Sequence, residues 1–179
     1  MALPDTFFVE QGTAIVWGEA GSSGVTSGAT ISLDALANGS ARMGASVDLG
    51  AKFARRYSVY FVVETGTAPT AGLTAELYLA SSYDNSTWPG GVTGSDGAWP
   101  SDGNEDEWTP QLGNPVSVLV ATNDGNTVQV QGPAIWEATG RYVAPVVDNN
   151  LGVAFRDETT ATDNGSRVIL VPLIEGVQE

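Results

Sequence analysis

Residues 56–64 read RYSVYFVVE, and this stretch decides the fold class. Tyr57, Val59, Phe61 and Val63 take every second position, which places side chains on one face of a β-strand. The remaining positions are also rich in residue types that favour strands. The stretch therefore predicts a strand with one face in a hydrophobic core.

The next apolar stretch, residues 73–80 (LTAELYLA), repeats the alternation. Its inward positions are predicted to be Leu73, Ala75, Leu77 and Leu79, and its outward positions Thr74, Glu76 and Tyr78. Residues 65–72 between the two stretches are rich in Gly, Thr and Pro, which suits a loop joining two adjacent strands. Residues 41–49 alternate more weakly, and we interpret them as a strand.

The second half of the chain contains further strand patterns separated by turn residues. The Asp-Gly pair in 123–126 lies between the β-favouring runs 115–121 and 127–131, which predicts a hairpin. Pro145 interrupts the run 141–147 and predicts an edge strand or a bulge there. Two more strands are expected at 151–155 and 166–174. With about eight strands and no long helix, the prediction is an all-β antiparallel sandwich or jelly roll with long loops.

Length and composition favour one domain. The chain has 179 residues, of which 42% are hydrophobic and 16% charged, so it can bury a core of its own. Its 22 glycines are spread along the sequence and mark no linker. We predict an N-terminal arm at 1–10 and a single sandwich domain at 11–179.

The residue types that are missing restrict the function. The chain has no His and no Cys, which removes histidine-dependent triads, thiol nucleophiles and zinc–thiolate sites. Pairs of carboxylates can be drawn from 21 acids in many ways, so they do not identify a hydrolase. We therefore expect a protein that binds and assembles, with no catalytic residues and no cofactor.

Charge and hydropathy indicate which partners to expect. A formal net charge of −14 repels the phosphates of a nucleic acid, so no nucleic-acid partner is expected. No apolar run approaches the roughly 20 residues of a spanning helix, so no membrane partner is expected. The first residues also lack the basic and then apolar order of a signal peptide, and we expect the product to stay where it is made.

Two stretches near the C-terminus carry a family resemblance. Residues 140–150 (GRYVAPVVDNN) and 166–173 (SRVILVPL) resemble the closing strands of head decoration, or cementing, proteins of tailed bacteriophages. The resemblance implies a jelly roll that binds the lattice of the major capsid protein and associates with copies of itself, as a dimer or trimer. It also implies a place on the virion surface after synthesis in the host bacterial cytoplasm. The family supplies no catalytic residues.

The N-terminal stretch is a candidate binding segment. It contains Leu3, Phe7 and Phe8 close to the chain end. The stretch could form a plain edge strand, but two adjacent phenylalanines need burial and terminal segments stay mobile unless something holds them. We therefore predict an arm that docks onto a neighbouring subunit.

Residues 81–113 form an excursion that is too long for an ordinary connection and contains Trp88, Trp99 and Trp108. Three interpretations stay open: the loop packs on a small core of its own, the tryptophans contact a partner protein, or they stack on sugars. The sugar interpretation gives the alternative function, a carbohydrate-binding module or the receptor-binding head of a tail fibre.

Two charged clusters complete the candidate sites. Lys52, Arg55 and Arg56 are three of only seven basic residues, and they suit an acidic partner or a second copy of the chain. The alternative is internal pairing with Asp48 or Glu64. The oxygen-rich residues Asp102, Asn104 and Asp106 are a weak candidate for a cation site, because Glu107 and Gly113 depart from the EF-hand pattern. A solvated acidic loop is the favoured interpretation.

Overall fold

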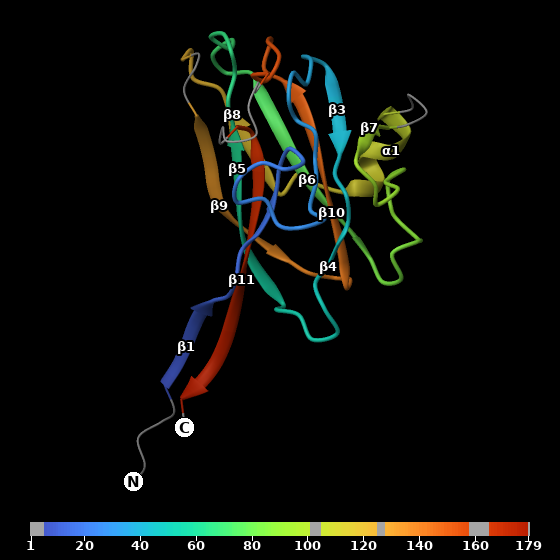
Figure 1. The fold of residues 1–179 in the computed structure, drawn as a ribbon, viewed down its shortest axis with the longest axis vertical. Coiled ribbons are helices and arrows are strands. Elements are labelled where there is room, and N and C mark those ends of the chain that lie inside the picture. Colours follow the sequence, from blue (N-terminus) through green and yellow to red (C-terminus); the bar gives the residue numbers. More distant parts are fainter. Residues whose placement is uncertain (1–5, 101–104, 125–127, 158–164, 179) are drawn as a thin grey trace.

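The computed structural model describes residues 6–100, 105–124, 128–157 and 165–178. Strands make up 44% of the structure and helix 4%, and the strands form two antiparallel sheets (Figure 1). The predicted all-β sandwich is therefore confirmed, while its jelly-roll connectivity stays a prediction. The described residues form more strands than the eight expected, since several of them are only two to four residues long.

The first sheet has the order β1-β11-β5-β9, with β2 also paired to β11. Its strands are β1 (Thr6–Gln11), β2 (Ile15–Trp17), β5 (Arg56–Val63), β9 (Gln129–Glu137) and β11 (Arg167–Gln178). The long strand β11 first pairs with β2, through Val168↔Trp17 to Leu170↔Ile15. It then continues past β2 and pairs with β1.

The second sheet has the order β7-β3-β10-β6-β8, with β4 also paired to β10. Its strands are β3 (Ser40–Met43), β4 (Val47–Asp48), β6 (Thr74–Ser82), β7 (Gly97–Trp99), β8 (Ser117–Val120) and β10 (Tyr142–Asn150). The single strand expected at 41–49 is instead two short strands, β3 and β4, separated by residues 44–46. The helix α1 (Glu105–Leu112) lies beside this sheet, close to β7 (Figure 1).

The main core lies between the two sheets. The four alternating residues of β5 are all buried in it, as the sequence predicts: Tyr57, Val59, Phe61 and Val63. Residues of β6 and β10 meet them from the opposite sheet, including Leu77, Val143 and Val147. Leu73 departs from its predicted inward position, because β6 begins one residue later and Leu73 is exposed.

A second core covers the outer face of the six-stranded sheet. Tyr78 of β6 and Val146 of β10 are buried there, on the face opposite to the main core. The prediction that Tyr78 faces outward is right for the strand, but the side chain is not exposed to solvent. The 81–113 excursion folds back over this face and buries it.

Two predicted connections between strands are wrong. The runs around 123–126 form no hairpin, because β8 pairs with β6 in one sheet and β9 pairs with β5 in the other. Residues 65–72 likewise join β5 and β6, which belong to different sheets. Local turn residues predict where the chain reverses, but the burial of both sheets against one core decides which strands pair.

The sequence suggested an edge strand or a bulge at Pro145, but the structure does not place Pro145 on an edge strand. It lies in β10, opposite Leu79 of β6, in the interior of the sheet. On its other side β10 pairs with β4 at Val143 and with β3 from Val146 onward, so Pro145 faces the break between these two strands. A proline without an N–H donor is tolerated here because the ladder is already interrupted.

Candidate interaction surfaces

The two ends of the chain form a ribbon that leaves the sandwich. β1 pairs with the last part of β11, from Gln11↔Leu173 to Thr6↔Gln178. Figure 1 shows this pair extending away from the sandwich, and Thr6 and Gln178 form its last described pair. We call residues 6–11 and 173–178 the terminal ribbon. The arm predicted from the N-terminal residues is therefore shared with the C-terminal strand.

The terminal ribbon has an open edge. β5 pairs with β11 only as far as Leu173↔Arg56, and no other described strand pairs with that edge of β11 beyond this point. An isolated two-stranded ribbon is marginally stable in water, and an open edge is a template for another strand. The ribbon is therefore suited to pairing with a further chain.

Apolar residues are exposed on the ribbon. Val9 is 59% exposed and Ile174 is also exposed. Phe7 and Phe8 occupy ladder positions opposite Val177 and Gly176. Leu3 lies outside the described residues. The predicted binding segment is thus present as a strand, and exposed Val9 is the residue of β1 on which its side-chain contacts can be tested.

A close backbone contact fixes the point where the ribbon leaves the sandwich. The Gly12 N–H donates to the Pro172 carbonyl at 2.9 Å, between the ladders of β1 and β2. A Cβ atom on residue 12 would lie 2.7 Å from Pro172 Cγ, a distance too short for real atoms. Residue 12 is therefore a glycine because a side chain would clash with Pro172. The close approach at Gly12 lets β1 and β2 both pair with β11.

A groove of about 660 Å³ lies at the root of the ribbon. Its apolar lining includes Ile15, Leu49, Phe53, Tyr57, Pro172 and Ile174. Lys52 and Arg55 from the predicted basic cluster also line it. We call this the root groove. It combines an apolar surface with two cationic side chains, a composition that fits an apolar segment carrying negative charge.

The two acids that the internal alternative named, Asp48 and Glu64, are paired with other arginines. Asp48 accepts two hydrogen bonds from Arg141, and Glu64 binds Arg156. Instead, Arg55 Nη2 lies 3.7 Å from Glu137 Oε2. Both side chains are mostly exposed, so this ion pair contributes little to the stability of the fold. Arg56 lies in β5 opposite Glu137. Lys52 has no ion-pair or hydrogen-bond partner among the described residues.

The acid that lines the root groove is neutralised within the protein. Hydrogen bonds from Arg141 and then from the Gly50 N–H hold the pKa of Asp48 below its usual value. The same contact raises the pKa of Arg141, whose guanidinium also lies 5.3 Å from the centre of the Tyr142 ring. Asp48 is already paired, and the ion pair between Arg55 and Glu137 is mostly exposed and weak. Lys52 therefore gives the groove a positive charge that is available to a partner.

The three tryptophans of the excursion mainly serve the second core. Trp99 is 4% exposed, and its indole N–H donates to the Gly90 carbonyl at 2.7 Å. The prediction of a partner-binding role is therefore wrong for Trp99, because its ring is buried inside the chain. Trp88 and Trp108 pack partly buried against the same core. For these two, the prediction of a partner contact stays untested.

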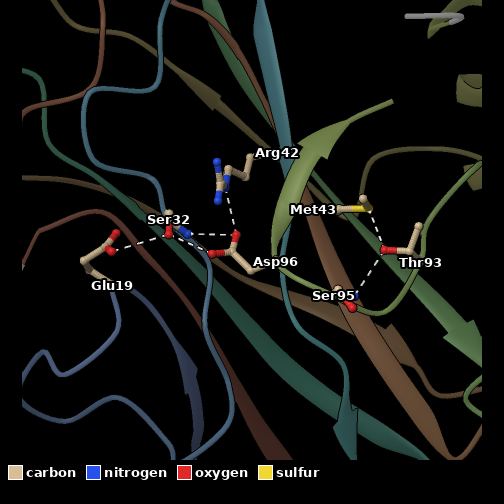
Figure 2. A network of polar contacts seen from close by, with 7 residues as sticks. All are labelled: Glu19, Ser32, Arg42, Met43, Thr93, Ser95 and Asp96. Atoms are coloured by element: carbon tan, nitrogen blue, oxygen red, sulfur yellow. Dashed lines mark hydrogen bonds and ion pairs between the residues drawn. The ribbon is translucent and has the colours of Figure 1, made fainter. Parts of the chain in front are cut away.

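A polar network ties the excursion to the sandwich, as Figure 2 shows. Asp96 accepts hydrogen bonds from Arg42 Nε at 2.8 Å and from the Ser32 hydroxyl at 2.7 Å. Ser32 also contacts Glu19 at 3.4 Å. Burial alone would raise the pKa of Asp96, but the hydrogen bonds from Arg42 and Ser32 outweigh it and lower that pKa. The network fixes the loop before β7 against β3.

We expect Asp96→Asn to lower the free energy of unfolding by about 1–2 kcal/mol at pH 7, because half-buried Arg42 loses its charged partner. A carboxyl group with a lowered pKa stabilises the fold above its unfolded pKa of about 4, and that contribution is lost as the pH falls through the folded value. The difference between wild type and variant should therefore shrink in acid. Urea unfolding at pH 7 and pH 3 checks this, and a difference independent of pH would contradict it.

The cation candidate receives no support from the described residues. Asp102 and Asn104 lie outside them, and Asp106 is in the first turn of α1. No group of three or more acidic, His or Cys residues that could hold a metal ion occurs within the described part of the chain. In the same part, no helix has the length and hydropathy required to span a membrane.

Comparison with known proteins does not assign a family. The chain matches no protein-family model, no curated protein and no solved structure. The surfaces described above are therefore the basis for a functional proposal.

Proposed function

We propose that this chain is a virion structural protein that decorates a phage capsid, binds the shell lattice and associates with copies of itself. The observation that carries this proposal is the terminal ribbon. A sandwich that presents a projecting strand pair, β1 with the last part of β11, with an open edge is equipped to join other subunits. Residues 140–150 and 166–173, which contribute to β10 and β11, resemble phage decoration proteins. This resemblance is the reason for proposing a capsid lattice as the partner.

The proposed mechanism is multivalent binding. Each subunit makes a modest contact through its ribbon and its exposed apolar residues, and many such contacts on one symmetric lattice add up to a stable coat. The net charge of −14 keeps free subunits apart, so attachment needs the local contacts of the ribbon. On this proposal the subunits are made in the host bacterial cytoplasm and become part of the virion surface.

Binding to the capsid can be measured directly. Purified protein mixed with undecorated phage capsids is expected to co-sediment at physiological salt and to saturate at a fixed number of copies per shell. Val9→Lys should weaken this binding, whereas Val120→Lys should not. Val9 and Val120 are the same residue type with exposures of 59% and 56%, and β8, which carries Val120, lies away from the terminal ribbon (Figure 1).

Two results would contradict the proposal. One is the absence of co-sedimentation with capsids at any protein concentration. The other is binding on a glycan array that Trp88→Ala or Trp108→Ala abolishes, which would favour the alternative of a carbohydrate-binding or receptor-binding head.

A further inference from the structure

We propose that the root groove is the seat for the terminal ribbon of a second copy of this chain, and that two copies exchange ribbons reciprocally. This inference deepens the proposed self-association and rests on it.

Charge complementarity is the first argument. No Lys or Arg precedes Arg42 and none follows Arg167, so both strands of the ribbon lack positive charge. The ribbon strands contain Glu10 and Glu175. The root groove presents Lys52 and Arg55, and its one acid, Asp48, is paired with Arg141. An acidic ribbon therefore meets a cationic groove.

This placement of charge matters because the chain as a whole is strongly acidic. Two copies with a net charge of −14 each repel one another at most surfaces. Among the described residues, Arg42, Arg55, Arg141 and Arg156 lie within ion-pair distance of an acid of the same chain. The root groove, where Lys52 is unpaired among the described residues, is a surface at which an acidic segment of a second copy gains attraction.

Apolar fit is the second argument. Ile174 and Phe53 both line the root groove and are both exposed, and Ile174 also belongs to the ribbon. A ribbon of a second copy would cover these side chains while bringing its own exposed Val9 out of water.

The symmetry of the arrangement follows from the position of the groove. The root of each ribbon, Pro172 to Ile174, forms part of the groove wall, so a ribbon that enters a neighbour's groove places its own groove beside the neighbour's ribbon. Both contacts then form at once about a two-fold axis. The open edge of β11 beyond Leu173 lies at this seam and is free for strand pairing with the second copy.

Charge reversal tests the inference with matched variants. One variant carries Lys52→Glu and Arg55→Glu in the groove, and the other carries Glu10→Lys and Glu175→Lys in the ribbon. Each variant alone is expected to be monomeric at concentrations where wild type is dimeric, with an increase in the dissociation constant of about tenfold or more. Light scattering after size exclusion and native mass spectrometry measure the state.

Mixing the two variants provides the decisive result. In a mixed dimer each acidic ribbon faces a cationic groove and each cationic ribbon an acidic groove, so the heterodimer should form where neither homodimer does. The chain that combines all four changes should dimerise with itself again. Restored association also shows that the variants are folded.

Three outcomes would overturn the inference: a wild type that is monomeric at every concentration, a dimer indifferent to both reversals, or variants that lose capsid binding but keep their dimer. The last would make the groove a seat for the capsid protein. Co-sedimentation of the wild type with undecorated capsids examines the proposed function, and light scattering of the wild type examines the dimer, so failure of the dimer and failure of decoration are distinguishable.

Discussion

Trp99→Ala is expected to lower the free energy of unfolding by about 3–5 kcal/mol, the largest single effect predicted for this protein. Trp99 is almost completely buried in the second core and pairs with Ala41 of β3 through the ladder of β7. Its removal leaves a cavity, and it leaves the Gly90 carbonyl without its indole donor. Urea unfolding followed by circular dichroism measures the change.

Tyr83→Ala is the matched control in the same excursion. Tyr83 is 74% exposed, so the substitution should change the free energy of unfolding by less than about 0.5 kcal/mol. Limited proteolysis should also cut the excursion faster in Trp99→Ala than in Tyr83→Ala, since the second core holds it on the sheet. Equal stability of the two variants would show that Trp99 does not hold the excursion on the sheet.

Deletion of residues 2–9 is expected to weaken self-association and capsid binding by at least about tenfold and to leave the melting temperature nearly unchanged. Residues 6–10 of β1 pair with β11 beyond Leu173, the last residue of its ladder with β5, and none of the described core residues comes from β1. The deletion therefore removes an interaction segment and little of the burial that stabilises the isolated subunit. Differential scanning calorimetry and analytical ultracentrifugation measure the two effects.

A large fall in melting temperature with unchanged association would contradict this prediction. It would mean that β1 belongs to the stabilising fold and does not serve assembly. Val120→Lys provides the control for nonspecific effects of a changed exposed residue, because Val120 is exposed on β8, which lies away from the ribbon (Figure 1).

The sequence by itself determined the fold class and the inward faces of the clearest strands. The alternation in 56–64 predicts the buried residues of β5 because a strand has a fixed two-residue period that needs no knowledge of its neighbours. Its length marked 81–113 as an excursion with three tryptophans, but the sequence left open whether it packs on a core of its own, contacts a partner or stacks on sugars. Composition alone removed histidine and cysteine chemistry.

Only the tertiary structure decided which strands pair and which side chains remain exposed. β8 and β9, on either side of the 123–126 run, lie in different sheets and form no hairpin, and Trp99 is buried because it packs on the outer face of a sheet. The partners of Asp48 and Glu64 are Arg141 and Arg156, which are more than 90 residues away in the chain.

The terminal ribbon and the root groove are both formed by residues that are far apart in the sequence. Residues from 12–15, 48–57 and 172–174 meet to form the groove, and β1 finds its partner at the other end of the chain. Sequence patterns report local periodicity, whereas these surfaces depend on long-range pairing that is set by the burial of both sheets. The sequence therefore identified the N-terminal arm and the basic cluster as separate features, and the fold placed them side by side.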